Sequence, residues 1–407
     1  MFDEAVTFLN SVDPGSAFDT SRTIEGNAGT HPIRYDLVRE FVSIIEQDAK
    51  FADHQRWMSH FIFNGNSTSL YTLANAIIRR VIGGVSPPKA MEEALDLIQS
   101  KTVDHIYGVG VSGIRTNTPI DFEDGFKLLP REALPSGPFR QRIVGLKFDG
   151  SEDVDFKING PAPCALIFSK KRQFIYRRGE NAQHDQGELQ PKFEKKIEAI
   201  LAAVAVSTDG SAKPRAYSFA IDHPLLKSTP DPFVSSSADF ARELGGLVVD
   251  LQPDGFAKIT RLIESLPPNH YRRLCLSTEF ARSSRTVNCS PLVRRAIDMG
   301  TALEVLLTPE QGSELSYRLC LRGAIAKGGS VQDRKQTFSA LREFYKLRSS
   351  AVHDGKFSSK YDYQKDYEKY YERIIGIDHL FQEIATNLVM TQIIERDWLD
   401  ETFNGAL

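Results

Sequence analysis

Few cysteines and no long apolar run occur in this sequence, and both features restrict the kind of protein that it encodes. Only four cysteines are found in 407 residues, without a C-x-x-C pair and without histidines at ligand spacing. This pattern predicts buried thiols and indicates neither a zinc site nor a disulfide framework. No run approaches the length of a membrane span, and the start, MFDEAVTFLN, lacks the segments of a signal peptide. We therefore expect a cytoplasmic protein that does not enter the membrane.

Several motifs of common enzymes are also missing. The patterns G-x-x-x-x-G-K-[ST], H-E-x-x-H and G-x-S-x-G do not occur, which argues against the usual NTPases, metalloproteases and α/β-hydrolases. Gly108, Gly110 and Gly113 form a literal G-x-G-x-x-G, but the residues after it predict a turn and not the helix that a dinucleotide site requires. A glycine-rich strand or bulge is the favoured interpretation. We expect neither a cofactor nor a bound metal.

The pattern of apolar residues changes along the chain and predicts an α+β protein. A hydrophobic content of 41% and a charged content of 25% are ordinary for a soluble protein, and the length allows two or three domains. Short apolar runs broken by turn residues begin at Val103 and indicate a small β-rich region, whereas helical periodicity dominates the last part. The predicted parts are a helical region at 1–102 with an irregular first 30 residues, a β-rich region with a closing helix at 103–225, a Pro- and Ser-rich linker at 226–254, and an all-α bundle at 255–400.

Helical spacing of apolar residues locates the individual helices. The stretches show apolar residues at steps of three, four and seven, and some begin with a residue suited to a helix start, as Ser290 and Pro291 are. The predicted helices cover about 35–49, 70–82, 91–98, 191–206, 256–265, 270–284, 291–307, 313–327, 330–355 and 363–394.

The helix predicted from Ser330 to Gly355 carries the clearest functional pattern. Ser330 is a suitable N-cap, and Gly355 offers the left-handed residue that commonly follows a helix C-terminus. Arg348 lies within the apolar stripe, where a guanidinium is expected only if it has a partner or lines a cleft. His353 follows five residues later, in the last turn. The stripe itself is formed by Phe338, Leu341, Phe344, Tyr345 and Val352.

An Arg and a His at this spacing occur by chance in a chain of this length, so the surrounding sequence has to carry the assignment. The runs SPLVRRAIDMGTALEVLLTP, LSYRLCLRGAIAKGG and LREFYKLRSSAVHDG resemble the HEPN superfamily, and within it the Apea-like HEPN domains. The shared pattern has an "ALE" helix followed by "Y-x-x-R-S-x-x-x-H". Here these residues are Ala302, Leu303 and Glu304, then Tyr345, Arg348, Ser349 and His353.

This resemblance implies a metal-independent endoribonuclease that acts as a homodimer. His353 would handle protons and Arg348 would offset the charge that develops on the phosphate, with Tyr345 and Ser349 in support. Glu304 would pair with Arg348, although an exposed helix carboxylate is the equal alternative. The alternative for His353 is a residue that binds a carbonyl at the helix end.

A group of arginines on two successive predicted helices provides a candidate RNA-binding surface. Such a row could follow a phosphate backbone, and the alternative is a solvated helix face with local ion pairs. The arginines are Arg272, Arg273, Arg282, Arg285, Arg294 and Arg295.

Two functions are compatible with these patterns. The first is a bacterial antiphage defence or toxin effector of the abortive-infection kind, whose N-terminal region senses a phage or host protein trigger or binds a partner. The second is a non-catalytic HEPN module that binds nucleic acid or a protein. Many HEPN proteins have a strongly polar residue directly after the Arg, and this chain has Ser349.

Overall fold

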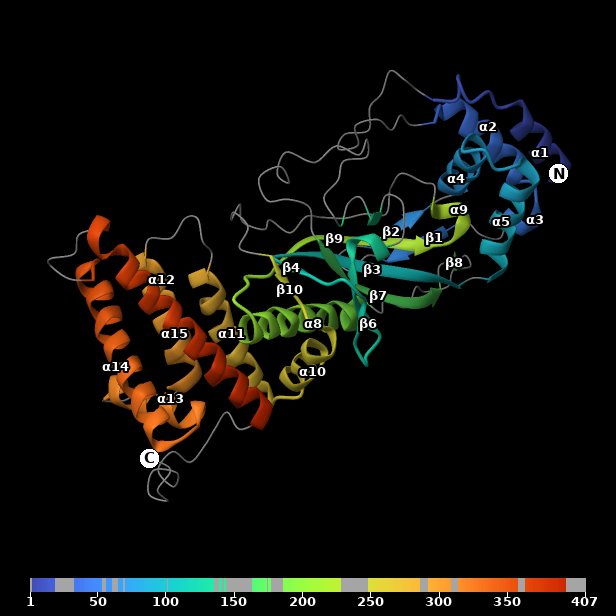
Figure 1. Cartoon of the computed structure of the whole chain (residues 1–407). Coiled ribbons are helices and arrows are strands. Elements are labelled where there is room, and N and C mark those ends of the chain that lie inside the picture. The colour runs from blue at the N-terminus through green and yellow to red at the C-terminus, as the bar shows by residue number, and fades with distance from the viewer. Residues whose placement is uncertain are drawn as a thin grey trace. The chain divides into compact units, whose positions relative to one another are not determined.

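The computed structural model consists of two compact units, each assembled from segments that are distant in the sequence (Figure 1). Unit 1 combines Met1–Gly110, Glu123–Phe193 and Arg215–Phe240, and unit 2 combines Val111–Phe122, Glu194–Pro214 and Ala241–Leu407. The boundaries of these two units therefore differ from those of the four ranges expected from the sequence. The structure describes residues 2–18, 33–52, 56–60, 65–68, 70–100, 102–134, 139–140, 143, 163–173, 175–176, 186–227, 248–285, 292–308, 314–357 and 363–392.

Unit 1 begins with a helix, where the sequence predicted irregular structure. Helix α1 buries Ala5 and Leu9, and the ring of Phe8 stacks on that of Phe41 with 5.4 Å between centroids. The prediction was wrong although Phe2, Ala5 and Leu9 recur at helical spacing, because the stretch is short and the mixed, Gly-rich residues that follow dominated the interpretation of this region. The helices of the unit are α1 (Phe2–Ser11), α2 (Tyr35–Ile45), α3 (Ala49–Ala52), α4 (Leu70–Ile82), α5 (Pro87–Ser100) and α9 (Pro224–Lys227).

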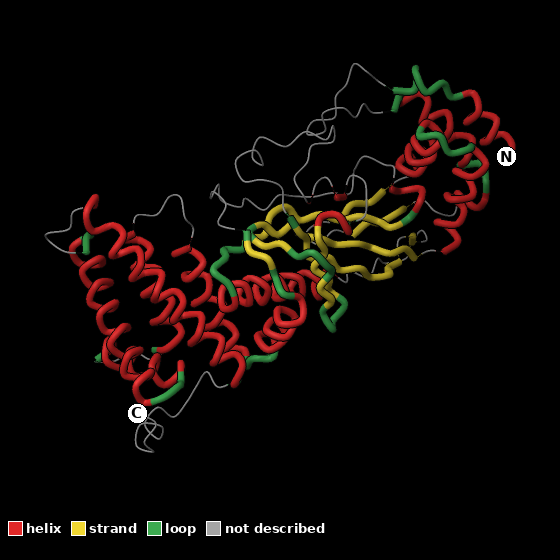
Figure 2. The backbone as a smooth tube through the Cα atoms, viewed as in Figure 1, coloured by secondary structure: helices red, strands yellow, loops and turns green. Residues whose placement is uncertain are grey.

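The strands that the structure describes form three sheets, drawn in yellow in Figure 2. Their orders are β2-β1-β8, β10-β4 and β5-β6-β7-β3-β9. Strands β6 and β7 pair antiparallel, with Phe126 opposite Phe168 and Pro130 opposite Cys164. The strands are β1 (Arg56–His60), β2 (Gly65–Thr68), β3 (Thr102–Ser112), β4 (Ile114–Arg115), β5 (Ile120–Asp121), β6 (Phe126–Pro130), β7 (Cys164–Gln173), β8 (Ile175–Tyr176), β9 (Lys213–Asp222) and β10 (Val249–Asp250), with a short 3₁₀ helix at Arg131–Ala133.

The G-x-G-x-x-G motif belongs to strands, as the sequence favoured. Gly108 and Gly110 lie in β3, and Gly113 links β3 to β4 with a φ of 82°. A Cβ atom at Gly113 would lie 2.3 Å from the carbonyl oxygen of Ser211, so the backbone approaches too closely for any side chain. No helix begins at the last glycine, and the pyrophosphate position of a dinucleotide site is therefore not formed.

Unit 2 is dominated by helices, and the α+β prediction is confirmed for the chain. Helix α11 packs on α12, α13 packs on α14, and α12 also contacts α14 and α15 (Figure 1). Buried Leu303, Leu341, Phe344 and Phe381 contribute to the core of these helices. The six predicted helices from residue 256 onward are all present, as α10 (Pro253–Glu264), α11 (Pro268–Arg285), α12 (Leu292–Leu307), α13 (Leu315–Lys327), α14 (Val331–Asp354) and α15 (Tyr363–Thr391).

The chain also contains helix α8 (Gln186–Ser207) and the short strand β10. Helix α8 corresponds to the closing helix predicted from residue 191. Most of the predicted linker, residues 228–247, lies outside the described residues. Its end forms β10, which pairs parallel with β4 and places Arg115 Nε 2.7 Å from Asp250 Oδ1. Among the helices described, none combines the length and the apolar character that a membrane span requires.

Candidate functional site

Helix α14 begins and ends as its sequence predicted. The Ser330 hydroxyl accepts a hydrogen bond from the Asp333 amide at 3.2 Å, and the Ser330 amide donates to the Asp333 carboxylate at 2.9 Å. This capping box satisfies two amides that the helix leaves unpaired. Hydrogen bonds from Ser330 hold the pKa of Asp333 below its ordinary value. Gly355 ends the helix in the left-handed conformation, with a φ of 64°.

The buried stripe of α14 differs in part from the predicted one. Leu341 and Phe344 are buried as predicted, whereas Val352 is 45% exposed, so its assignment to the apolar stripe was wrong. The helix turns its small residue Ala351 inward instead, and Leu347 fills the position before Arg348. Sequence periodicity could not distinguish these neighbouring faces because both carry apolar residues.

Arg348 has a partner on a neighbouring helix. Its Nη2 donates to Glu304 Oε2 at 2.9 Å, and the two side chains are 20% and 19% exposed. Glu304 lies on α12, so the ion pair joins α12 to α14 across 44 residues of sequence. Of the two interpretations of Glu304, the structure confirms the pair with Arg348. An arginine in an apolar stripe is thereby accounted for.

Tyr345 completes this cluster from the same helix as Arg348. Its hydroxyl donates to Glu304 Oε1 at 2.9 Å, and the Arg348 guanidinium carbon lies 5.7 Å from the centre of its ring. Burial, followed by the hydrogen bond to Glu304, raises the pKa of Tyr345 to about 12. The phenol therefore stays protonated at neutral pH and donates to the carboxylate. Tyr345 and Arg348 together bind both oxygens of Glu304 and fix its orientation.

His353 and Ser349 lie on the same helix but outside this cluster. The structure places His353 on the surface in the last turn of α14, and Ser349 is half-buried. Five residues along an α-helix correspond to about 7.5 Å of axial rise between Arg348 and His353. No hydrogen bond of either His353 or Ser349 side chain occurs among the described residues. The exposed imidazole is therefore accessible to a bound molecule.

Most of the arginines predicted to bind RNA instead form hydrogen bonds or ion pairs with groups of the protein itself. Arg285 and Arg295 are only 4% and 5% exposed, so a phosphate backbone cannot reach their guanidinium groups. Arg295 Nε donates to the Ser284 carbonyl at 2.7 Å, and Arg282 Nη1 donates to the Ala212 carbonyl at 3.0 Å. Arg294 pairs with Asp298 at 2.9 Å, which is the local ion pair of the alternative interpretation.

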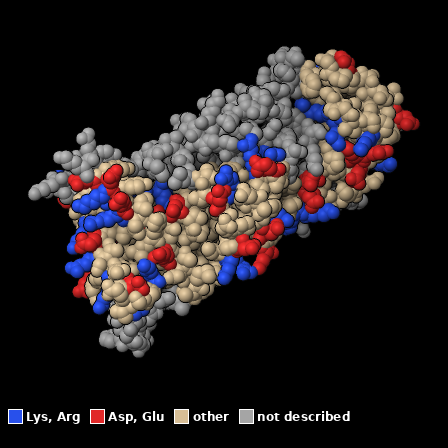
Figure 3. All heavy atoms as spheres, in the orientation of Figure 1, with Lys and Arg blue, Asp and Glu red and all other residues tan. Residues whose placement is uncertain are grey.

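The composition of α11 explains why the sequence did not predict the burial of these arginines. The helix buries several small residues, among them Ser277, Ala281 and Ser284, and Ser277 donates to the Ala302 carbonyl of α12 at 2.7 Å. Without a stripe of large apolar residues, the sequence does not show which side of the helix is buried. Of the six arginines, only Arg272 and Arg294 are exposed, and Arg273 and Arg282 are half-buried. Figure 3 shows Lys and Arg interspersed with Asp and Glu on the visible face of this unit.

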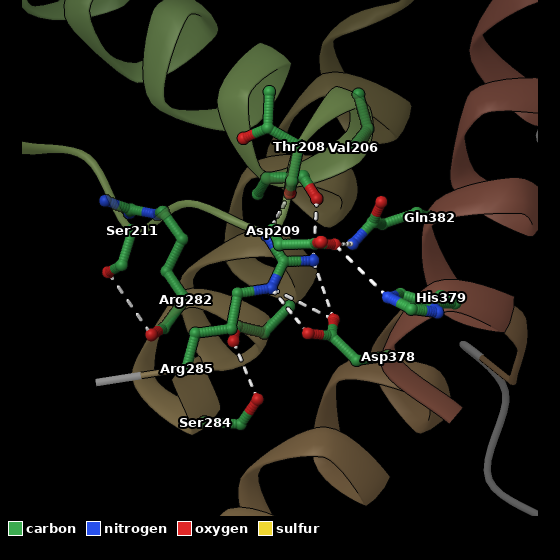
Figure 4. A network of polar contacts seen from close by, with 12 residues as sticks. Val206, Thr208, Asp209, Ser211, Arg282, Ser284, Arg285, Asp378, His379 and Gln382 are labelled. Atoms are coloured by element: carbon green, nitrogen blue, oxygen red, sulfur yellow. Dashed lines mark hydrogen bonds and ion pairs between the residues drawn. The ribbon is translucent and has the colours of Figure 1, made fainter. Parts of the chain in front are cut away.

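Arg285 forms a polar centre that the sequence did not reveal (Figure 4). Its Nη2 donates to Asp378 Oδ1 at 2.7 Å, and its Nε lies 2.9 Å from Asp378 Oδ2. The remaining donors bind the backbone after and at the end of α8, through the carbonyls of Ala205, Thr208 and Gly210. We call Arg285, Asp378 and these three carbonyls the Arg285 clasp. The only sequence signal would have been two charged residues, 93 positions apart, that both lie on core-facing sides of helices.

An open hollow of about 710 Å³ lies beside the Arg285 clasp. Asp209 Oδ1 accepts a hydrogen bond from Gln382 at 2.7 Å and lies 3.5 Å from His379 Nε2 (Figure 4). Lys327 and Glu383 pair at 3.3 Å on its edge. Most of the charged groups of the hollow are thus already matched with each other.

The cysteines that the structure describes are thiols inside the protein. Cys164 and Cys320 are buried and Cys275 is half-buried, while Cys289 lies outside the described residues. Burial raises the pKa of Cys320 to about 11 and that of Cys275 to about 12, so both stay protonated at neutral pH. No group of three potential metal-ligating side chains occurs in the described part of the chain.

Comparison of the chain with protein-family models, with curated proteins and with solved structures found no match in any of the three. The resemblance to HEPN domains therefore stays a prediction from the sequence runs quoted for α12 to α14.

Proposed function

We propose that unit 2 carries a metal-independent endoribonuclease site of the HEPN type, with Arg348 and His353 as its reactive side chains. The observation that carries this proposal is the combination of pairing and partial exposure at Arg348. Its guanidinium is fixed by Glu304 and partly exposed, on the same helix as the accessible His353. A fixed cation and an accessible imidazole are groups that phosphodiester cleavage can use.

The proposed reaction uses the ribose of the substrate as its nucleophile. The 2′-oxygen attacks the adjacent phosphorus, the bond from phosphorus to the 5′-oxygen breaks, and a 2′,3′-cyclic phosphate and a 5′-hydroxyl result. His353 carries the proton that leaves the 2′-hydroxyl or the proton that the 5′-oxygen receives. Arg348 offsets the negative charge on the phosphate oxygens in the transition state. In this proposal two copies of the chain form a homodimer in which their α14 ends meet.

The biological setting belongs to the same proposal. RNA cleavage that responds to infection suits an antiphage defence or toxin effector in the cytoplasm. Unit 1 contains its own core, in which Phe41, Ile77 and Leu97 are buried. A unit with a separate core can respond to a phage or host protein trigger without contributing to the chemistry.

A second function is favoured by one observation. The charge of Arg348 is already paired with Glu304, as expected for an arginine that only joins two helices. In that case unit 2 would bind nucleic acid or a protein without cleaving it. The two functions differ in whether removal of His353 changes anything besides binding.

The deciding experiment measures cleavage of a single-stranded RNA by the purified full chain. We expect His353→Ala and Arg348→Ala each to abolish cleavage, while circular dichroism and the dimer mass from light scattering stay unchanged. Cleavage should persist in EDTA, because His353 and Arg348 supply the chemistry. DNA should be left intact, because it lacks the 2′-hydroxyl.

Two variants serve as matched controls. Arg342→Ala removes an exposed arginine from the same helix, and His379→Ala removes a histidine that is 57% exposed on α15. Both should cleave like the unmodified protein. Equal cleavage of DNA, a requirement for a divalent metal, or full activity of His353→Ala would overturn the nuclease proposal and favour the binding module.

A further inference from the structure

Arg348 lies directly against the backbone of α12 at Gly300. A Cβ atom built on Gly300 would be 2.6 Å from Arg348 Cγ, 3.2 Å from Nε and 3.3 Å from Cδ. A distance of 2.6 Å is well below an ordinary carbon–carbon contact of about 3.5–4.0 Å. The Arg348 side chain therefore occupies the space that any other residue at position 300 would fill.

Glycine at this position has no conformational explanation of its own. Gly300 lies inside α12, is buried, and has no positive φ. A glycine in a helix interior is less favourable than alanine because it loses more backbone freedom on folding. The contact with Arg348 supplies the missing reason, since only a hydrogen atom fits between the helix and this side chain.

The contact with α12 and the ion pair with Glu304 together limit which nitrogens of Arg348 can bind a ligand. Nη2 donates to Glu304, and Nε is buried and hydrogen-bonds none of the described residues. Nη1 makes no hydrogen bond to the described residues either, but it is not among the buried unpaired atoms. Among the five N–H groups of the guanidinium, the two on Nη1 are consequently free of any bond to the described residues and can donate to a substrate.

We propose that Gly300 is a positioning residue, which seats Arg348 against α12 so that Nη1 is presented to a phosphate oxygen. This inference rests on the proposed RNA cleavage and adds to it a residue outside the Y-x-x-R-S-x-x-x-H pattern. The fork formed by Nε and Nη2 is closed to an oxyanion, because Nε is buried against α12 and Nη2 donates to Glu304.

A double-mutant cycle in thermal stability tests the contact independently of activity. Gly300→Ala should lower Tm in the unmodified protein, because the new methyl group displaces Arg348. In the Arg348→Ala background the same change should raise Tm by about 2–4 °C, the gain of alanine over glycine in a helix. A loss of equal size in both backgrounds would show that the methyl group collides with something else, and would overturn the inference.

Cleavage kinetics test the role of the contact. We expect Gly300→Ala to lower kcat about 100-fold, as for a misplacement of about 1 Å in a reacting group. KM should change much less, because the buried methyl group leaves the surface side chains of the protein unchanged. The matched control is Gly376→Ala, a glycine inside α15 where a Cβ atom would meet nothing within 4 Å. This control should keep full activity and gain stability.

The outcomes separate this inference from the proposed function. An unmodified protein that cleaves RNA, together with an equally active Gly300→Ala, would overturn the positioning role alone. An unmodified protein that cleaves no RNA would overturn the proposed function and the phosphate contact with it. The thermal cycle would in that case still decide whether Gly300 seats Arg348.

Discussion

Buried arginines of unit 2 show that residue type alone does not assign a role. Arg285 and Arg348 are both arginines on helices, and each meets a carboxylate from another helix. Arg285 is 4% exposed and uses its donors on Asp378 and on three backbone carbonyls, whereas Arg348 is 20% exposed and bonds to the described residues through Nη2 alone. The first is a structural group and the second can serve a substrate.

Loss of the Arg285 clasp should lower the stability of the fold by a measurable amount. Arg285→Met should lower the free energy of unfolding by about 3–5 kcal/mol, because Asp378 would remain buried without a partner. The double variant Arg285→Met with Asp378→Leu should lose less than the sum of the two single variants. Urea denaturation followed by circular dichroism measures these values.

An exposed ion pair provides the control for this prediction. Lys346 and Glu343 are 62% and 53% exposed and pair at 2.8 Å on α14. Lys346→Ala should therefore change the free energy of unfolding by less than about 1 kcal/mol. Strictly additive losses for Arg285 and Asp378 would contradict the assignment of the clasp as one coupled unit.

At the scale of elements, α14 depends on its two ends. The capping box at Ser330 satisfies amides that have no partner within the helix, and Gly355 allows the chain to turn away after the last turn. Both devices fix where the helix starts and stops. They consequently also fix how far His353 is from the end of the helix.

Removal of the cap tests this role of Ser330. Ser330→Ala should lower the free energy of unfolding by about 1 kcal/mol, because the Asp333 amide loses its acceptor. Ser339→Ala is the matched control, since Ser339 is an exposed residue in the middle of the same helix. That control should be neutral or slightly stabilising, because alanine is the better helix former. Equal losses for both variants would show that the cap does not limit the stability of α14.

At the scale of the whole molecule, the two units should respond differently to pH. His223 in unit 1 is 6% exposed, and its Nδ1 accepts a hydrogen bond from the Leu225 amide at 3.3 Å. Burial lowers the pKa of His223 below 6.5, and the nearby carboxylates of Asp96, Glu93 and Asp222 oppose this only in part. Folding therefore favours the neutral imidazole.

The sign of the pH dependence follows from this shift. Above the unfolded pKa of 6.5 the imidazole is neutral in both states, and its contribution to stability is complete. As the pH falls below 6.5, the unfolded chain binds a proton that the folded chain excludes, so unit 1 loses stability until the lower folded pKa is reached. Thermal melts between pH 8 and 5 should show this loss, and His223→Gln should reduce it. His379→Gln, at an exposed site, should leave it unchanged.

The sequence by itself determined the features that depend on neighbouring residues. The limits of α14 followed from Ser330 and Gly355, and the helices of unit 2 followed from apolar spacing, because capping and amphipathic periodicity act within a few residues. The placement of the glycine motif in a strand followed from the turn residues after it. The helix at Phe2–Ser11 was missed because it is only ten residues long and the Gly-rich stretch after it gives no helical pattern.

Only the tertiary structure decided which charged residues meet. The sequence offered the pair of Arg348 with Glu304 only as one of two alternatives, and it did not relate Arg285 to Asp378, because the partners are 44 and 93 residues apart. The same holds for the arginines of α11, whose small contact residues give no sign of the buried side, and for Gly300, whose use is visible only beside Arg348. Packing between helices chooses these contacts because it depends on shape and burial across the whole core, and a sequence window contains neither.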